Sequence, residues 1–175
     1  VMCGMYATVG VLAALRHRDA TGIGQQIDIA LVDSQIAWLI NEGTNFLTSG
    51  KRPQRRGNEH PNIAPYQVYG AANGHVIVAV GNDRQFARFC AFIGYIHLAA
   101  DPRFATNPAR LENRDALNVV VEPVLAAITV ENIITGLEAV SVPVGPVNTL
   151  DQMFRSEQVI ARNMQVNLTN SANNA

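Results

Sequence analysis

Apolar residues in the first fifty positions follow helical spacing, then strand spacing, then helical spacing again. They recur every three or four positions over residues 2–18, which predicts a helix with one apolar face. Residues 26–31 alternate between polar and apolar side chains, a pattern typical of a short strand. A second helix is expected over residues 35–47, where Asp33 and Ser34 can cap it. This order of helix, strand and helix favours an α/β layer.

The next part of the chain carries the pattern of a hairpin followed by helices. Residues 66–71 and 75–81 each predict a strand, and Asn73-Gly74 between them is a strong signal for a tight turn. The second strand is almost continuously apolar, so we expect it to be buried. The remaining predicted elements are a helix over residues 84–93 capped by Asp83, a helix from Asn107 past Leu117 that restarts at Pro123, a helix over residues 130–140, an extended segment over residues 142–147, and short helices over residues 150–154 and 156–164.

A polar loop over residues 49–65 separates these two parts and marks a domain boundary. Pro53, Gly57 and Pro61 interrupt regular structure there. The loop is either a mobile segment whose basic side chains meet an anionic ligand or a solvated linker with ordinary surface charge, and the pattern leaves both interpretations open. Its basic residues are Lys51, Arg52, Arg55 and Arg56.

Composition narrows the class of protein. The chain has 175 residues, of which 48% are hydrophobic and 15% charged, and this excludes an intrinsically disordered chain. The 13 basic residues against 14 acidic ones give a formal net charge of -1, so we expect no nucleic-acid partner. No stretch reaches the roughly 20 apolar residues of a membrane-spanning helix, so we expect no membrane partner either.

Few residues form a recognisable catalytic, metal-binding or cofactor-binding motif. The four histidines are scattered at no ligand spacing and the two cysteines do not make a zinc site, so we expect no metal. Gly22-x-Gly24 precedes the predicted strand instead of following one, which argues against dinucleotide binding. Cys90 shares an apolar helix face with Phe86 and Ile93, which predicts a buried structural thiol.

Residues 57–68 read Gly-Asn-Glu-His-Pro-Asn-Ile-Ala-Pro-Tyr-Gln-Val, and this segment resembles the family III CoA-transferases of the CaiB/BaiF type. The resemblance extends from Val1 to about Met164, and the matching motifs occur in the order that the family has. Within the family, the sequence is similar to the branch that acts on dicarboxylates such as glutarate with succinyl-CoA. The other matching motifs are residues 4–7, 12–15, 21–25, 74–86, 101–107, 113–114 and 142–150.

This resemblance implies an α/β protein of two domains, a Rossmann-like large domain and a small α+β domain, with two protomers linked as a homodimer. On this mapping residues 1–50 are a partial large domain, and residues 51–65 are the linker and active-site loop. Residues 66–141 form the small α+β domain. Residues 142–175 hold the start of the return to the large domain and a tail, which from Asn167 onward we expect to be frayed.

The resemblance also implies acyl-CoA:carboxylate CoA transfer through an aspartyl-CoA intermediate. In the family an aspartate attacks the donor thioester, and the resulting anhydride is converted to an aspartyl-CoA thioester that the acceptor carboxylate resolves. The coenzyme A thioester is a substrate, and no permanently bound cofactor is expected. The family's nucleophile aligns immediately before Val1, so no catalytic residue is expected in this chain, and the chain alone is expected to be inactive.

Members of the family close a glycine-rich loop near the small-domain entry over the active site, which shelters the intermediate from water. Its counterpart here is residues 57–62, where four other residues replace a run of glycines and predict a stiffer loop. An arginine that precedes the loop is expected to meet an acceptor carboxylate, which a guanidinium fork fits. The candidate substrate-contacting residues are Arg55, Arg56, Gly57, Asn58, Glu59, His60, Pro61 and Asn62.

Two other functions stay open. An α-methylacyl-CoA racemase of the same fold would use a proton-shuttling pair that includes the same upstream aspartate. A non-catalytic, truncated module would dimerise or bind a partner through the apolar face of the helix over residues 2–15. For the transferase, the expected partners are an acyl-CoA, a small carboxylate and a second copy of the chain, and the expected location is the cytoplasm.

Overall fold

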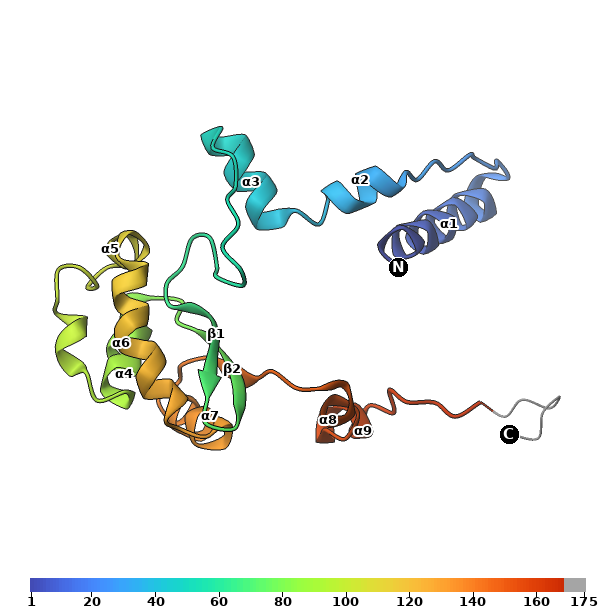
Figure 1. The fold of residues 1–175 in the computed structure, drawn as a ribbon. Coiled ribbons are helices and arrows are strands. Elements are labelled where there is room, and N and C mark those ends of the chain that lie inside the picture. Colours follow the sequence, from blue (N-terminus) through green and yellow to red (C-terminus); the bar gives the residue numbers. More distant parts are fainter. Residues whose placement is uncertain (169–175) are drawn as a thin grey trace. The chain divides into compact units, whose positions relative to one another are not determined.

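The computed structural model describes residues 1–168, and these divide into two units, residues 1–56 and residues 57–168 (Figure 1). The boundary between the units lies inside the polar loop that the sequence singles out. Most of the predicted frayed tail, residues 167–175, lies outside the described residues. The assignment of these parts to a large and a small domain of the resembling family stays a prediction.

Residues 1–56 form the helices α1 (Met2–Thr21), α2 (Leu31–Ile36) and α3 (Ile40–Ser49). The predicted strand over residues 26–31 is wrong, because that segment pairs with no other strand among residues 1–168. A β-strand requires backbone hydrogen bonds to a second strand, and an alternating pattern of side chains does not supply that second strand. The single helix predicted over residues 35–47 is also wrong in detail, since the chain is broken at residues 37–39 into two shorter helices.

The first unit leaves its apolar side chains uncovered. Met5, Tyr6, Val9 and Leu12, on the predicted apolar face of α1, are between 45% and 67% exposed. Among residues 1–56, Ser34 alone is buried. The unit therefore has helices but no hydrophobic core of its own.

The second unit is built on a three-stranded antiparallel sheet in the order β1-β2-β3. Its strands are β1 (Tyr66–Ala71), β2 (Gly74–Ala79) and β3 (Val144–Pro146). β1 pairs with β2 in the register that sets Tyr66 opposite Ala79, and β3 pairs with the other edge of β2, where Val76 lies opposite Pro146. The structure thus confirms both strands of the predicted hairpin and the extended segment that follows residue 142.

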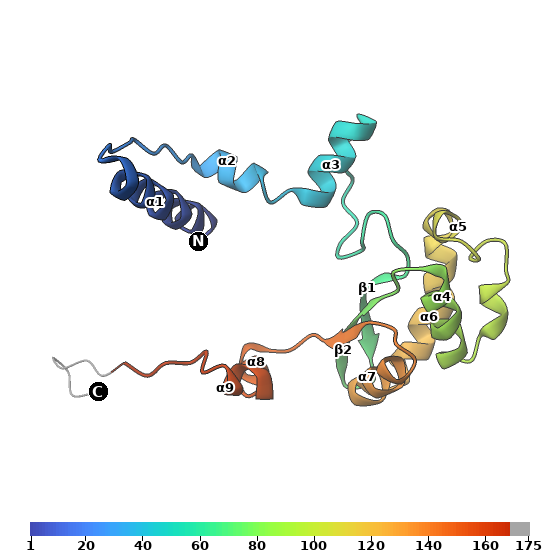
Figure 2. The ribbon, with the colours of Figure 1, turned by 180° about the vertical axis from the view of Figure 1, so that it is seen from behind.

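The helices of the second unit are α4 (Asp83–Phe92), the 3-10 helix η1 (Ile96–Ala99), α5 (Asn107–Glu112), α6 (Arg114–Ala126), α7 (Val130–Ala139), α8 (Leu150–Phe154) and α9 (Glu157–Ala161). Both views show α4, α6 and α7 together beside β1 and β2 (Figures 1 and 2). Three predictions are wrong in detail. The single helix predicted from Asn107 past Leu117 is broken at Asn113 into α5 and α6. Asn82, not Asp83, caps α4 by accepting the Gln85 N–H, and Pro123 lies inside α6 instead of restarting a helix.

The turn of the hairpin lies one residue earlier than predicted. Ala72 and Asn73 form it, and Gly74 is already the first residue of β2. The Asn73 side chain explains the difference, because its Oδ1 accepts the Val130 N–H at 2.8 Å and its Nδ2 donates to Glu131 at 3.0 Å. Asn73 thereby ties the hairpin to the start of α7 and does not take the left-handed backbone of a primed turn.

The hydrophobic core lies between the sheet and the helices α4, α6 and α7. It includes Cys90, as the sequence predicts. Gly136 on α7 lets the Phe92 ring pack directly on the helix backbone, because a Cβ at that position would collide with the ring. No single helix among the described residues is long and apolar enough to cross a membrane, and α6 with α7 passes that test only as a pair bent by 115°. The largest fully buried hydrophobic side chains are Tyr69, Phe86, Phe89, Phe104, Leu117, Leu125, Ile133 and Leu137.

We expect the second unit to lose stability as the pH rises above about 9. Burial raises the pKa of the Cys90 thiol from 9.0 to about 12, and burial together with the Glu122 carboxylate raises the pKa of the Tyr69 hydroxyl above 10.0. Both groups stay protonated in the fold at a pH where the unfolded chain ionises them. Unfolding then releases protons, so the free energy of unfolding falls as the pH rises.

Urea unfolding of the whole chain at about pH 8 and about pH 10.5 measures this loss as a shift of the midpoint. The double variant Cys90→Ala/Tyr69→Phe is the matched control, because it removes both ionisable groups and keeps most of the buried apolar surface. Its midpoint should shift less between the two pH values. An equal shift in the variant would contradict the assignment of the alkaline loss to these two residues.

Candidate functional site

The loop over residues 57–65, which we call the anchored loop, folds back onto the start of β1. Its first residue has a left-handed φ of 66°, which favours the glycine found there. Asn58 Oδ1 accepts the Val68 N–H at 2.7 Å, and the His60 N–H donates to the Tyr66 carbonyl at 2.9 Å. The first half of the loop is therefore hydrogen-bonded to the strand that follows it.

Side chains of α5 hold the second half of the loop. Asn107 Nδ2 donates to the Asn62 carbonyl at 2.8 Å, and Asn107 Oδ1 accepts the Ala64 N–H at 3.1 Å. Arg110 Nε donates to the Ala64 carbonyl at 2.6 Å. Side chains of one short helix are thus hydrogen-bond partners of three backbone groups of the loop.

The Arg110 side chain is fully buried, which is rare for a cation. Besides its bond to Ala64, it donates from Nη1 to the Phe104 carbonyl at 2.9 Å and from Nη2 to Asp83 Oδ1 at 2.8 Å. Its Cζ atom lies 4.4 Å from the centroid of the Phe86 ring. Asp83, predicted from the sequence as a helix cap, is instead the counterion of this buried guanidinium.

Side chains of α6 hold the loop from another direction. Arg114 Nη2 donates to the carbonyls of His60 at 2.7 Å and Ile63 at 3.4 Å. Arg114 Nη1 lies 3.3 Å from Glu59 Oε2, although it is not aligned to donate a hydrogen bond. Asn118 Nδ2 reaches the other oxygen of Glu59 at 3.5 Å. Two loop carbonyls and the Glu59 carboxylate therefore converge on α6.

The His60 ring is fixed in place as well. It stacks on the Tyr66 ring with centroids 4.8 Å apart and an interplanar angle of 14°. Its Nδ1 accepts the Asn62 N–H at 3.1 Å, which assigns the proton of the neutral imidazole to Nε2. The loop histidine is thus held in one orientation by a ring contact and by backbone.

The two arginines of the candidate set belong to the first unit, and their contacts differ. Arg56 Nη1 lies 2.5 Å from Glu42 Oε1 on α3, so its charge is already paired. Arg55 is exposed and has no ion pair within the described part of the chain. Of the two guanidinium groups, that of Arg55 is the one available to a carboxylate ligand.

Sequence reasoning assigned no role to the residues that hold the anchored loop from α5 and α6. The spacing of Arg114 and Asn118 carried a usable signal, because residues four apart share one side of a helix. Polar side chains in that row, beside the buried Leu117 and Val121, indicate a polar contact with a neighbouring segment. What the sequence could not indicate is that the neighbour is the loop some fifty residues earlier.

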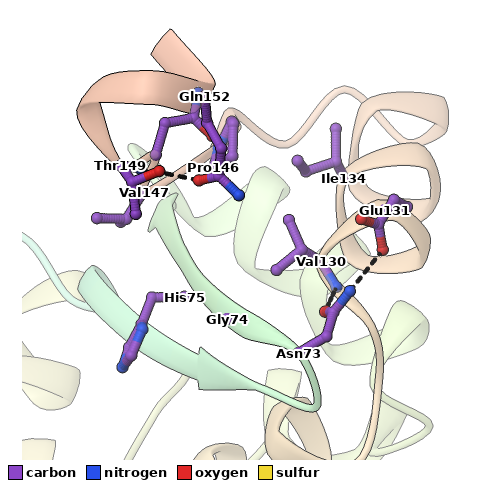
Figure 3. Close-up of a pocket in the computed structure, with 11 residues that line it drawn as sticks. Asn73, Gly74, His75, Val130, Glu131, Ile134, Pro146, Val147, Thr149 and Gln152 are labelled. Atoms are coloured by element: carbon purple, nitrogen blue, oxygen red, sulfur yellow. Dashed lines mark hydrogen bonds between the residues drawn. The ribbon is translucent and has the colours of Figure 1, made fainter.

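A separate cavity of about 500 Å³ lies at the opposite end of β1 from the anchored loop, among the hairpin turn, the start of α7 and the start of α8 (Figure 3). Asn73 and Glu131 are hydrogen-bonded to each other on one wall. The Thr149 N–H donates to the Gln152 side chain on another, and His75 extends away from these groups. The polar groups named here are engaged with one another, so the cavity offers a ligand few of them.

Carboxylates near the anchored loop take part in ion pairs. Glu59 faces Arg114, and Asp101 pairs with Arg103 at 2.7 Å. The Arg103 guanidinium holds the pKa of the Asp101 carboxyl below its ordinary value. Within residues 1–168 no aspartate or glutamate is buried, and no cluster of side chains could hold a metal ion. The described residues therefore place no sheltered carboxylate for nucleophilic attack.

The sequence model of CoA-transferase family III matches residues 1–175. The chain belongs to this family. It is 41% identical over 168 residues to the succinate–glutarate CoA-transferase of Agrobacterium fabrum, a match that covers 96% of this chain and 42% of that protein. It is 34% identical over 163 residues to the acetyl-CoA:oxalate CoA-transferase of Acetobacter aceti, which covers 93% of this chain and 42% of the relative.

The fold of the chain also matches that of a solved protein of this family. A CaiB/BaiF family protein from Brucella suis aligns with a TM-score of 0.78 and 42% identity, over 95% of this chain and 44% of that one. The family resemblance of residues 57–68 and the mixed fold of helices with a small antiparallel sheet are thereby confirmed. The chain spans about two fifths of the length of the curated relatives named here. The Rossmann-like description of residues 1–50 stays a prediction.

Proposed function

We propose that this chain is part of an acyl-CoA:carboxylate CoA-transferase that moves coenzyme A from succinyl-CoA to a dicarboxylate. The observation that carries the proposal is the 41% identity to the succinate–glutarate CoA-transferase across 96% of this chain. Human and mouse relatives, 31% and 32% identical, are named succinyl-CoA:glutarate CoA-transferase and support the same substrate class. All of these relatives are named as transferases, which favours transfer over racemase chemistry on this fold.

The nucleophile of this reaction is proposed to be an aspartate outside residues 1–175, aligned just ahead of Val1. The resemblance of residues 4–7 supports this, because the family's nucleophile lies just ahead of the segment that matches them. The chain alone is then expected to be inactive. The coenzyme A thioester enters as a substrate, and the aspartyl-CoA intermediate requires no permanently bound cofactor.

The anchored loop is proposed to cover the reacting groups, and Arg55 to bind the acceptor carboxylate. The hydrogen bonds of the loop support the first role, since a substrate-facing segment must be held in position. The exposed, unpaired guanidinium of Arg55 supports the second. Residues 66–141 would form the small domain of a cytoplasmic homodimer, and the uncovered apolar side chains of α1 support association with further protein.

A hybrid enzyme tests this function. In it, the matched 168-residue region of the Agrobacterium fabrum relative is replaced by that of this chain. We expect the hybrid to form glutaryl-CoA from succinyl-CoA and glutarate, and the purified 175-residue chain to form none. Absence of transfer by the hybrid, or racemisation of an α-methylacyl-CoA in place of transfer, would overturn the proposal.

Two arginine variants of the hybrid sharpen the test of the acceptor site. Arg55→Gln should raise the KM for glutarate by about tenfold with little change in kcat, because it removes a charged contact made equally in the ground and transition states. Arg56→Gln is the matched control, since Glu42 already occupies that guanidinium. Equal effects of the two substitutions on KM would contradict the role of Arg55.

A further inference from the structure

One side chain, Arg114, contacts three residues of the anchored loop. Its Nη2 donates to the carbonyls of His60 and Ile63, at 2.7 Å and 3.4 Å, and its Nη1 faces the Glu59 carboxylate. The Arg114 side chain is only 11% exposed, so these charge-assisted contacts form largely out of reach of bulk water, where they are stronger. Loss of the guanidinium would release the backbone of the loop at two points.

The contact with Glu59 is the weakest part of this arrangement. Arg114 Nη1 is buried and lies 3.3 Å from Glu59 Oε2 without the alignment of a hydrogen bond. Asn118 reaches Glu59 only at 3.5 Å. The Glu59 side chain is 27% exposed, so water can solvate the carboxylate when it swings away. Arg114 thus holds the loop backbone firmly and the Glu59 side chain loosely.

We call the contacts of Arg114 and Asn118 with the anchored loop the clamp. A further hydrogen bond connects this clamp to the sheet. Asn118 lies one turn after Arg114 on α6, and its Oδ1 accepts the Tyr69 hydroxyl hydrogen at 3.2 Å. The Tyr69 ring is buried in the core between β1 and the helices. The base of the clamp is therefore fixed by packed side chains, and only its Glu59 end faces solvent. Such an arrangement holds a loop in one place and gives it one weak point.

We propose that Arg114 is the positioning residue of the anchored loop and that the Glu59–Arg114 ion pair is the part of the clamp that opens. The proposal rests on the proposed function, in which this loop shelters an acyl intermediate from water. When the loop is released, water adds its oxygen to the acyl carbon, and the bond from that carbon to its leaving group breaks. The net products are succinate and coenzyme A with a free thiol, and glutarate is left unchanged.

Amide hydrogen exchange of the 175-residue chain tests the clamp without any assay of activity. The reporters are the loop amides of His60 and Asn62, which are hydrogen-bonded in the fold. Arg114→Gln should speed their exchange by about 30-fold and Glu59→Gln by about fivefold. The double variant should match Arg114→Gln alone, because Glu59→Gln acts through its contact with Arg114, which is already lost.

Controls for the exchange measurement lie within the same unit. Core amides such as that of Val78 should change by less than about twofold in every variant, which excludes general loosening of the fold. Arg155→Gln breaks the exposed ion pair with Asp151 on α8 and should leave loop exchange unchanged. Should Arg114→Gln fail to fold, Arg114→Lys, which lacks the fork, decides whether Arg114 positions the loop, and Glu59→Gln decides whether the ion pair is the part that opens.

The hybrid enzyme described above supplies a readout that a merely structural role would not move. We measure the ratio of free coenzyme A to glutaryl-CoA formed from succinyl-CoA. Arg114→Gln should raise this ratio by about tenfold, and Arg114→Lys should restore part of the difference, because an ammonium reaches one loop carbonyl but lacks the fork. A residue that serves stability alone would lower both products together and leave their ratio constant.

Each result decides something different. Loop exchange within about twofold of the unsubstituted chain in Arg114→Gln and Glu59→Gln would overturn the proposal. Faster exchange with an unchanged product ratio would overturn its claim about water. Failure of the unsubstituted hybrid to transfer coenzyme A would overturn the proposed function instead, and the exchange result would still decide whether Arg114 holds the loop.

Discussion

Replacement of Arg110 by Gln should lower the free energy of unfolding of the chain by about 3 kcal/mol. The Arg110 side chain is fully buried and donates to the carbonyls of Ala64 and Phe104. A glutamine is too short to reach both, and a buried carbonyl left without a donor costs about 1–3 kcal/mol. The Asp83 carboxylate adds little to the loss, because it is 56% exposed and water can solvate it.

Arg103 is the matched control for this experiment. Like Arg110, it pairs with an aspartate, Asp101, and lies over an aromatic ring, with its Cζ atom 4.9 Å from the centroid of Phe104. Unlike Arg110, its side chain is 60% exposed. Because solvent screens an exposed pair and competes for its donors, Arg103→Gln should leave the denaturation midpoint almost unchanged.

The measurement is urea unfolding of the two variants, each made in the whole chain. The dependence of the free energy of unfolding on urea concentration should be the same in both. The same types of partner surround both arginines, so a difference between them reports burial and the two backbone carbonyls. Arg110→Lys should recover only part of the loss, since one ammonium replaces three directed donors. Equal midpoints for Arg110→Gln and Arg103→Gln would show that the buried contacts of Arg110 contribute nothing net.

Local pattern predicted the elements of the second unit well, because each is decided by its own residues. The strand predicted over residues 66–71 and the helix predicted over 150–154 have the bounds of β1 and α8. Pro123 misled the prediction, since it removes a hydrogen bond to the Val119 carbonyl but does not end α6. Val119 is 73% exposed, so water can take the place of the missing donor. Solvent exposure of one helix face is a tertiary property that the local sequence does not report.

The candidate site depends even more on tertiary contacts that the local sequence does not report. Residues 57–62 were predicted as the important loop from their motif, but their partners lie about fifty residues later on α5 and α6. Arg110 carries a charge, and sequence patterns place charged side chains at the surface. Only the fold brings its guanidinium against Phe86 and the Ala64 carbonyl. The motif therefore supplied the candidate residues, whose contact with a ligand stays a prediction, whereas the side chains that hold them required the structure.

Residues 57–168 should fold by themselves, whereas residues 1–56 should not. The core side chains from Tyr69 to Val142 all belong to the second unit. The first unit buries no apolar side chain, so it lacks the hydrophobic burial that offsets a backbone entropy cost of about 1–2 kcal/mol per residue. We expect one cooperative thermal transition for residues 57–168. For residues 1–56 we expect a gradual loss of helix without a transition.

Two controls connect these outcomes to burial. In the fragment of residues 57–168, Leu117→Ala should lower the free energy of unfolding by about 2–5 kcal/mol, because that side chain is fully buried. In the fragment of residues 1–56, helix content should rise with protein concentration, since Met5 and Leu12 are exposed and can pack against a second copy. A cooperative transition of residues 1–56 that did not depend on concentration would mean that this segment builds a core by itself.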